Sequence, residues 1–270
     1  MTNIIKADLY RTKKSPSLYI VAGVSFLFVL LSAFVFKGLD AVFNTLASSD
    51  INLGIPDFSN EILGALGINT SFLCTKEILK SDTLFYVLIP IFIVVSSTEF
   101  ASGTLKNSLS AGISRKNVFF SKFATSCIYT VIYYAIFFVS AILCSCLAYW
   151  QPISFSEFAE LMGIFVKQIP IYVGIIATGH FFVFATQSTA LSIGLYIATF
   201  TVVNTILPML NALIDTKVNI TLLFPLFQCI ELTNASISAI NYATIYGSTL
   251  LYIIFSLWIG YSKFRKAELK

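Results

Sequence analysis

The sequence predicts an all-α membrane protein with six transmembrane helices. Hydrophobic residues make up 57% of the 270 positions and charged residues only 11%, and the mean hydropathy is +0.86, all far from the average soluble domain. A helix needs about 20 apolar residues to cross a bilayer, because unpaired backbone groups are too costly in hydrocarbon. Segments of that length lie at 17–36, 79–98, 118–147, 163–185, 190–213 and 243–262. The whole chain, 1–270, therefore reads as one transmembrane domain.

The residues before the first span, MTNIIKADLYRTKKSPS, predict an N-terminal interfacial helix. Ile4, Ile5 and Leu9 stand among basic residues, so a helix here would lie on the inner headgroups with its charges in water. Pro16 then allows the chain to turn into the first span. A disordered basic tail is the alternative interpretation.

Basic residues set the direction of the spans, because Lys and Arg are retained on the cytoplasmic side. With the N-terminus inside, the inner segments hold 12 of the 17 basic residues and three of the 13 acidic ones. We therefore expect both termini in the cytoplasm, and an even number of spans agrees. The basic groups are scattered beside helix ends, which favours membrane lipid as a partner and gives no indication of nucleic acid.

Two outer regions are too long to be simple turns. Residues 37–78 predict an acidic external loop with one or two short helices. Its acidic residues include Asp40, Asp50, Asp57 and Glu61. Residues 214–242 contain NITLLFPLFQCIEL, an apolar piece that is too short to cross and is interrupted by Pro225. Such a piece is typical of a re-entrant extracellular hairpin, here placed before the last span.

The polar stretch EFASGTLKNSLSAGISRKNVFFSK, residues 99–122, lies inside between the second and third spans. Small and apolar residues recur there every four positions, at Ala101, Leu105, Leu109 and Ile113. This period predicts an amphipathic helix over about 99–112 on the membrane surface. Glu99 lies near its N-terminus, where the helix dipole favours a carboxylate, and Gly112 is placed to end it. An ordinary cytosolic linker is the alternative.

The cytosolic stretch resembles the coupling helix of a type-2 ABC (ATP-binding cassette) transporter permease. The matching residues are Glu99, Gly103, Thr104, Leu105, Lys106, Ser114, Arg115 and Lys122. The predicted topology is similar over the whole chain, from the interfacial helix to the hairpin. One departure is Gly112, where many relatives have a proline.

The resemblance implies a separate ATPase (nucleotide-binding) subunit, which would bind ATP and Mg²⁺ and dock on the coupling helix. The expected contact residues are Glu99, Gly103, Thr104, Leu105, Lys106, Leu109, Arg115 and Lys116. This chain is expected to bind no cofactor itself, because it lacks the G-x-x-x-x-G-K-[ST] phosphate loop. We therefore expect a transport subunit that is not an enzyme by itself.

The resemblance also implies a second permease, identical or related, so that two copies of the six spans surround a central path. Candidates to line it are the polar residues of the fifth span, Thr201, Asn204, Thr205 and Asn211, together with Pro208, which is available to bend the span. Hydrogen bonding between helices is the alternative role for these side chains. No metal site is expected, because the five cysteines lack C-x-x-C spacing and His180 stands alone in an apolar run.

Permeases of this size resemble those of bacterial systems for peptide export and lantibiotic immunity. The expectation is a bacterial plasma-membrane exporter of amphipathic or antimicrobial peptides. The absence of a charged residue near the centre of any span disfavours a proton relay. The alternatives are an ABC exporter of lipid, polysaccharide or ion, or a membrane scaffold or sensor that transports nothing.

Overall fold

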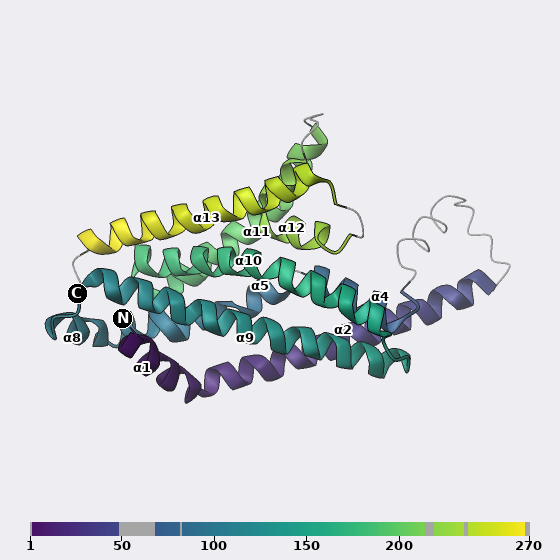
Figure 1. Cartoon of the computed structure of the whole chain (residues 1–270), viewed down its shortest axis with the longest axis horizontal. Coiled ribbons are helices and arrows are strands. Elements are labelled where there is room, and N and C mark those ends of the chain that lie inside the picture. The colour runs from purple at the N-terminus through teal and green to yellow at the C-terminus, as the bar shows by residue number, and fades with distance from the viewer. Residues whose placement is uncertain (1, 49–67, 82, 214–218, 235–236, 268–270) are drawn as a thin grey trace.

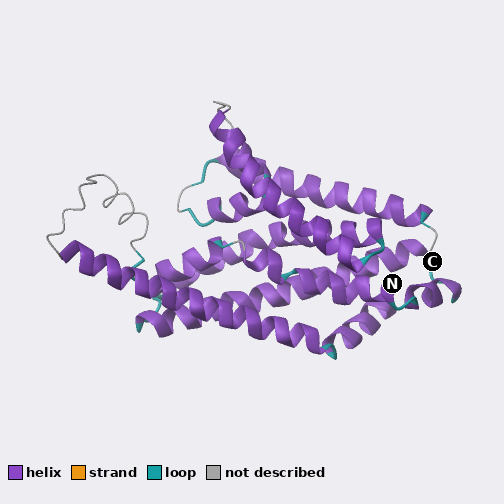
Figure 2. Cartoon of the chain, turned by 180° about the vertical axis from the view of Figure 1, so that it is seen from behind, coloured by secondary structure: helices purple, strands orange, loops and turns teal. Residues whose placement is uncertain are grey.

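The computed structural model describes residues 2–48, 68–81, 83–213, 219–234 and 237–267. The regular elements in these ranges are all helices (Figure 2). Six candidate spans among them are long and apolar enough to cross a membrane: Pro16–Val42, Thr83–Phe100, Arg115–Tyr149, Phe155–Thr186, Thr189–Leu213 and Ala239–Lys266. The predicted all-α fold with six spans is confirmed. Of the predicted acidic loop residues, Asp50, Asp57 and Glu61 lie outside the described residues.

Five of the six spans are continuous helices, and shorter helices lie before, between and beside them. In chain order they are α1 (Thr2–Lys13), α2 (Pro16–Ser48), α4 (Ser71–Lys80), α8 (Thr104–Ser110), α9 (Arg115–Tyr149), α10 (Phe155–Thr186), α11 (Thr189–Leu213), the 3₁₀ turn η2 (Ile220–Leu223), α12 (Pro225–Glu231) and α13 (Ala239–Lys266). Both described ends of the chain and α8 lie at the same end of the bundle (Figure 1). An even number of spans produces this arrangement, and the cytoplasmic placement of this end stays a prediction.

The second span is built from four short pieces. They are α5 (Thr83–Val87), α6 (Ile89–Phe92), the π-helical turn η1 (Ile93–Ser97) and α7 (Thr98–Ala101). Pro90 lies in the first turn of α6, where its missing N–H is tolerated but the preceding helix cannot run on unbroken. In η1 the Thr98 N–H donates to the Ile93 carbonyl, one residue further back than in an α-helix. The sequence analysis predicts one uninterrupted helix over 79–98, and this is wrong in detail: Leu79 belongs to α4 and the span begins at Thr83. Pro90 is the sequence signal for the first break, whereas the hydropathy pattern shows no sign of the π-helical turn.

The N-terminal helix α1 is docked on the bundle. It packs against α9, where the Tyr129 hydroxyl donates to the Leu9 carbonyl over 2.9 Å. Asp8 and Thr12 are buried, while Lys6 and Lys13 are exposed. Helix α1 therefore presents its lysines outward, as the sequence predicts, but its opposite face contacts the third span, and Arg11 reaches back to Glu99.

Helices α10 and α13 pack extensively against each other and run side by side (Figure 1). The methyl group of Thr249 on α13 lies 3.3 Å from where a Cβ at Gly174 would be. On another face of α10, a Cβ at Gly179 would lie 2.5 Å from the ring of Phe92. The second span can approach α10 this closely because residue 179 has no side chain. His180 beside it is fully buried among aromatic rings.

The apolar piece predicted as a hairpin forms η2 and α12, next to α11. Helix α12 packs against α10 and α4, and η2 packs against α13 and α11. Gln228 of α12 is fully buried and donates from Nε2 to the Leu222 carbonyl over 2.9 Å and to Ser248 Oγ over 2.7 Å. The piece is thus held inside the bundle, and its depth in a membrane stays a prediction.

Candidate functional site

The segment 99–116 contains the largest group of residues that the sequence singles out. The predicted helix over 99–112 is present as two pieces, α7 and α8, separated by Ser102 and Gly103. Gly103 has a left-handed backbone, with φ +68, and this conformation breaks the helix at a residue that can adopt it without strain. Glu99 therefore belongs to the last turn of the second span rather than to the helix that follows.

Gly112 ends the segment's second helix. The Gly112 N–H donates to the Leu109 carbonyl over 3.0 Å, and Gly112 has φ +86. Left-handed glycine directly after a helix satisfies its last carbonyls. Proline is restricted to φ near −65° and could not adopt this conformation. The turn leads into Ser114, the N-cap of α9.

The apolar row of the segment faces the bundle. Leu105 is buried, and Leu109 and Ile113 are partly buried against the core. Thr104, Lys106 and Asn107 are the exposed side of α8. A docking partner would therefore contact a polar surface, because the apolar face of the amphipathic helix packs against its own chain.

Arg115 and Lys116 differ in what they contact. The Arg115 guanidinium donates to the carbonyls of Phe264, Arg265 and Ala267, at 2.8, 3.0 and 2.7 Å. It thus caps the C-terminus of α13, where a cation is favoured by the helix dipole. Lys116 is exposed. Of this pair of predicted contact residues, Lys116 is the one available to a partner.

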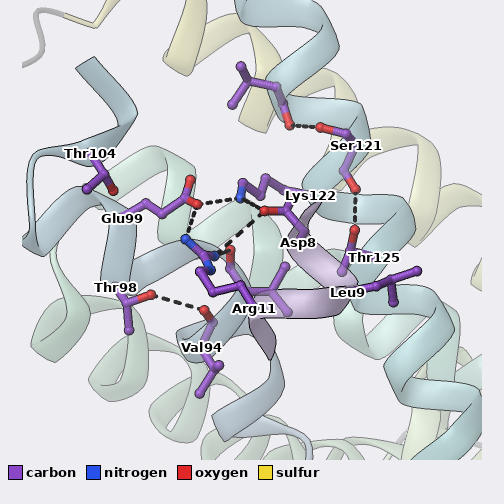
Figure 3. Close-up of polar contacts among 12 residues, drawn as sticks. Asp8, Leu9, Arg11, Val94, Thr98, Glu99, Thr104, Ser121, Lys122 and Thr125 are labelled. Carbon is purple, nitrogen blue, oxygen red and sulfur yellow. Dashed lines mark hydrogen bonds and ion pairs between the residues drawn. The ribbon is translucent and has the colours of Figure 1, made fainter. Parts of the chain in front are cut away.

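Four ionisable side chains meet behind the segment and form what we call the charge cluster: Asp8, Arg11, Glu99 and Lys122 (Figure 3). The Lys122 ammonium donates to Asp8 Oδ1 over 2.5 Å and to Glu99 Oε1 over 2.6 Å. Arg11 Nη1 donates to the same Glu99 oxygen, and Arg11 Nη2 donates to the Val95 carbonyl in η1 over 3.3 Å. The cluster joins α1, the end of the second span and the start of α9.

Because the cluster is largely buried, separating its opposite charges would be costly. Asp8, Glu99 and Lys122 are 5%, 8% and 2% exposed, and the two carboxylates balance the two cations. A buried charge that loses its partner is costly, because its desolvation is no longer offset. Burial is also the main cause that raises the pKa of the Asp8 carboxyl, against the lowering effect of Lys122. Asp8 Oδ2 is buried with no hydrogen-bond partner among the described residues.

Sequence reasoning missed Asp8 and Arg11 as site residues and used them only to orient the chain. Two signals point to them. Lys122 lies inside an apolar run, where a lysine needs a carboxylate partner. Asp8 and Arg11 are three residues apart, hence on one face of an N-terminal helix. Neither signal says which carboxylate pairs with which cation.

The predicted path residues lie apart from the charge cluster, on α11. Thr205 is exposed, and its hydroxyl donates to the Thr201 carbonyl one turn earlier. Asn211 Oδ1 accepts from the Ile220 N–H over 3.0 Å. Asn204 is half-buried beside these, and its Oδ1 has no hydrogen-bond partner in the described part of the chain. Pro208 lies inside the helix.

The described residues were also compared with the requirements of a metal site. Within the described ranges, no group of three or more His, Cys, Asp or Glu could hold a metal ion. The five cysteines are free thiols. The arrangement around residues 99–116 holds helices together and presents a polar surface.

Comparison with known families supports the resemblance to an ABC transporter permease. A family model described as "ABC-2 family transporter protein" matches residues 4–208, which is well over half of the chain and includes the charge cluster and the 99–116 segment. No curated protein matches the sequence.

Proposed function

The chain belongs to the ABC-2 transporter family, and on this premise we propose that it exports amphipathic or antimicrobial peptides from a bacterial cell. Membership and six apolar helices make it a multi-pass permease subunit that works with a partner ATPase. The proposal places both termini and the 99–116 segment in the cytoplasm. The partner ATPase binds ATP and Mg²⁺ there, and this chain performs no chemistry itself.

The observation that carries the coupling role is the exposed face of α8. Thr104, Lys106 and Asn107 stand at the end of the bundle that also holds both described chain ends (Figure 1). Their helix is fixed from behind by buried Leu105. A short polar helix of about two turns suits a shallow groove on a partner subunit.

Binding of the ATPase tests this assignment. Lys106→Glu reverses an exposed charge without touching the core, and we expect the affinity for the co-expressed ATPase to fall about tenfold or more. Lys6→Glu, a charge reversal at another exposed lysine, on α1, is the matched control. Substitution of Leu105 is unsuitable, since a buried residue reports on folding. Equal affinity of wild type and Lys106→Glu in a pull-down titration would sink the assignment.

A peptide substrate is supported by the character of the spans. The ionisable groups buried together lie at one end, in the charge cluster, while α11 combines hydroxyl and amide groups with exposed apolar residues such as Leu195 and Val202. Such a surface suits a molecule that is both polar and apolar. We propose a second copy of the chain, or a related permease, as the partner that encloses the path.

Resistance to peptides tests the substrate. Co-expression of the chain and its ATPase in a susceptible bacterium should raise the inhibitory concentration of cationic amphipathic peptides, and the Lys106→Glu permease should not. Unchanged susceptibility, together with ATP-dependent movement of a fluorescent phospholipid in proteoliposomes, would instead establish the lipid alternative.

A further inference from the structure

We infer that a pocket on α10 binds the headgroup of a phospholipid that carries both a phosphate and a primary ammonium, as phosphatidylethanolamine does. The pocket lies between α10 and the residues that follow α12, toward the end of the bundle opposite to α8 (Figure 1). Its lining residues are Glu160, Gly163, Ile164, Lys167, Leu232, Thr233 and Asn234. The inference goes beyond the proposed function and does not depend on what the chain exports.

The size of the pocket suits a headgroup. Its volume is about 260 Å³, and pockets for drug-sized ligands begin at about 300 Å³, so a headgroup fits and an amphipathic peptide does not. The lining residues of α10 recur every three or four positions from Glu160 to Lys167 and therefore share one face of the helix. Gly163 leaves this face open, because a Cβ there would meet nothing within 4 Å.

Lys167 supplies a cation for the phosphate. It is exposed and forms no ion pair with any described residue. Its ammonium lies 5.7 Å from the centre of the Tyr242 ring, and the Tyr246 hydroxyl donates to its carbonyl over 3.1 Å. Lysine beside tyrosines is typical of the boundary between hydrocarbon and headgroups. Residues 167–186 of α10 also provide the roughly 20 residues that cross the hydrocarbon core, which places Lys167 at the depth of lipid phosphates.

Oxygen acceptors in the same pocket suit an ammonium. Glu160 Oε1 accepts from Lys76 over 2.9 Å, while Glu160 Oε2 accepts no hydrogen bond from the described residues. Asn234 Nδ2 donates to Glu231 Oε2 over 2.9 Å, which leaves the Asn234 carbonyl oxygen as an acceptor. A primary ammonium has three N–H donors for these oxygens. A choline headgroup has no N–H donor, so it would satisfy neither oxygen.

The order of the charges along α10 matches their order in the headgroup. Glu160 is two helical turns closer than Lys167 to the start of α10, which is about 10 Å along the axis. In a phospholipid the phosphate lies next to the hydrocarbon and the ammonium lies further out. The phosphate therefore pairs with Lys167 and the ammonium with Glu160. A lipid bound in this way joins α10 to the residues that follow α12.

Lipid binding to the full-length chain in detergent tests the inference. Short-chain phosphatidylethanolamine is titrated, and bound lipid is counted by native mass spectrometry. Phosphatidylglycerol and phosphatidylcholine with the same acyl chains are the comparisons. We expect saturable binding of one phosphatidylethanolamine per chain, with an affinity about tenfold or more above that of phosphatidylcholine. Glycerophosphoethanolamine, which has no acyl chains, should compete only weakly. Competition as strong as that of the lipid would assign the pocket to a soluble ligand and overturn the inference.

Three variants locate the site. Gly163→Leu fills the pocket from a position where an added side chain meets no neighbour, so it should abolish binding in a folded protein. Gly247→Leu on α13, where a Cβ also meets nothing within 4 Å, is the matched control. Lys167→Met should weaken phosphatidylethanolamine and phosphatidylglycerol alike, by about tenfold. Glu160→Gln should weaken phosphatidylethanolamine alone.

Wild-type binding of phosphatidylethanolamine by Gly163→Leu would overturn the inference, because the lipid would then be held elsewhere. An equal effect of Glu160→Gln on both lipids, or no effect, would overturn selection by the ammonium. Thermal unfolding of each variant checks that it is folded. If Lys167→Met does not fold, Gly163→Leu decides whether the lipid occupies this pocket.

Discussion

Two largely buried polar networks hold shorter elements onto the long helices, one with charges and the other with neutral amides. The charge cluster fixes α1 and the end of the second span to α9. The amide network centres on Gln168 of α10 and Gln228 of α12, both fully buried. Gln168 accepts from the Tyr134 hydroxyl over 2.5 Å and donates to the Cys229 carbonyl over 2.9 Å. Gln228 accepts from Thr249 and donates to Ser248.

The two networks differ in the free-energy cost of removing one partner. An amide that loses a partner leaves one neutral group unsatisfied, whereas an ion pair that loses a partner leaves a bare charge. The charged network stands next to the exposed α8, and the amide network secures the piece predicted as a hairpin. Loss of a partner is therefore more costly in the charge cluster, which lies at the end of the molecule where the ATPase is proposed to bind.

Removal of the shared cation should have the largest effect. Lys122→Met leaves Asp8 and Glu99 buried with Arg11 as their remaining cation, and we expect a loss of about 3–5 kcal/mol in stability. The check is thermal unfolding of the purified protein in detergent, with exposed Lys116→Met on the same helix as control. A melting temperature equal to that of the control would show that the cluster is not strongly coupled to folding.

Removal of an amide should cost less. Gln168→Leu strands the Tyr134 hydroxyl and the Cys229 carbonyl, and we expect a loss of about 2–3 kcal/mol. Addition of Tyr134→Phe should recover part of this loss, because one unsatisfied group disappears. If Gln168→Leu proves more damaging than Lys122→Met in the same assay, the proposed ranking of the two networks is wrong.

The pH dependence of stability distinguishes the networks as well. Burial raises the pKa of Asp8 in the folded protein, while Lys122, Glu99 and Arg11 face it. The folded state therefore binds more protons at Asp8 than the unfolded state does. This contribution is fully present below the ordinary aspartate pKa and is lost as pH rises through the folded value.

Asp8→Asn should remove this component, so the melting temperature of the variant should fall less than that of wild type as pH rises from acid toward neutral. Gln228→Leu, a variant of the amide network, should keep the wild-type slope. Parallel profiles for wild type and Asp8→Asn would contradict the assignment.

The smallest effect is expected on α11. The Thr205 hydroxyl donates to its own helix, so Thr205→Val should change stability by no more than about 0.5 kcal/mol. Any change in peptide resistance with this variant would then report contact with the substrate. Thr244→Val on α13, where the hydroxyl likewise donates one turn back, is the control. Equal resistance in both variants would remove Thr205 from the path.

Local sequence rules account for most of the helical framework. Apolar runs predict six spans, because a buried backbone must form its hydrogen bonds within its own helix. The caps are equally local: Ser114, Ser154 and Ser238 each accept from a backbone N–H three residues ahead. Gly112 ends a helix, as its position in the sequence predicts. These features depend on neighbours within a few residues, so the chain can be interpreted one segment at a time.

The partners of the buried charges follow from tertiary structure alone. Lys122 bonds to Asp8, 114 residues away in the chain, and Arg11 bonds to Glu99, 88 residues away. Helical period places Glu99 beside the docking segment but does not say whether it points outward to a partner or inward. Hydropathy is a sum over neighbouring residues, whereas an ion pair depends on where separate helices meet. For this reason the spans could be predicted from composition, and the charge cluster appeared only when the helices were packed together.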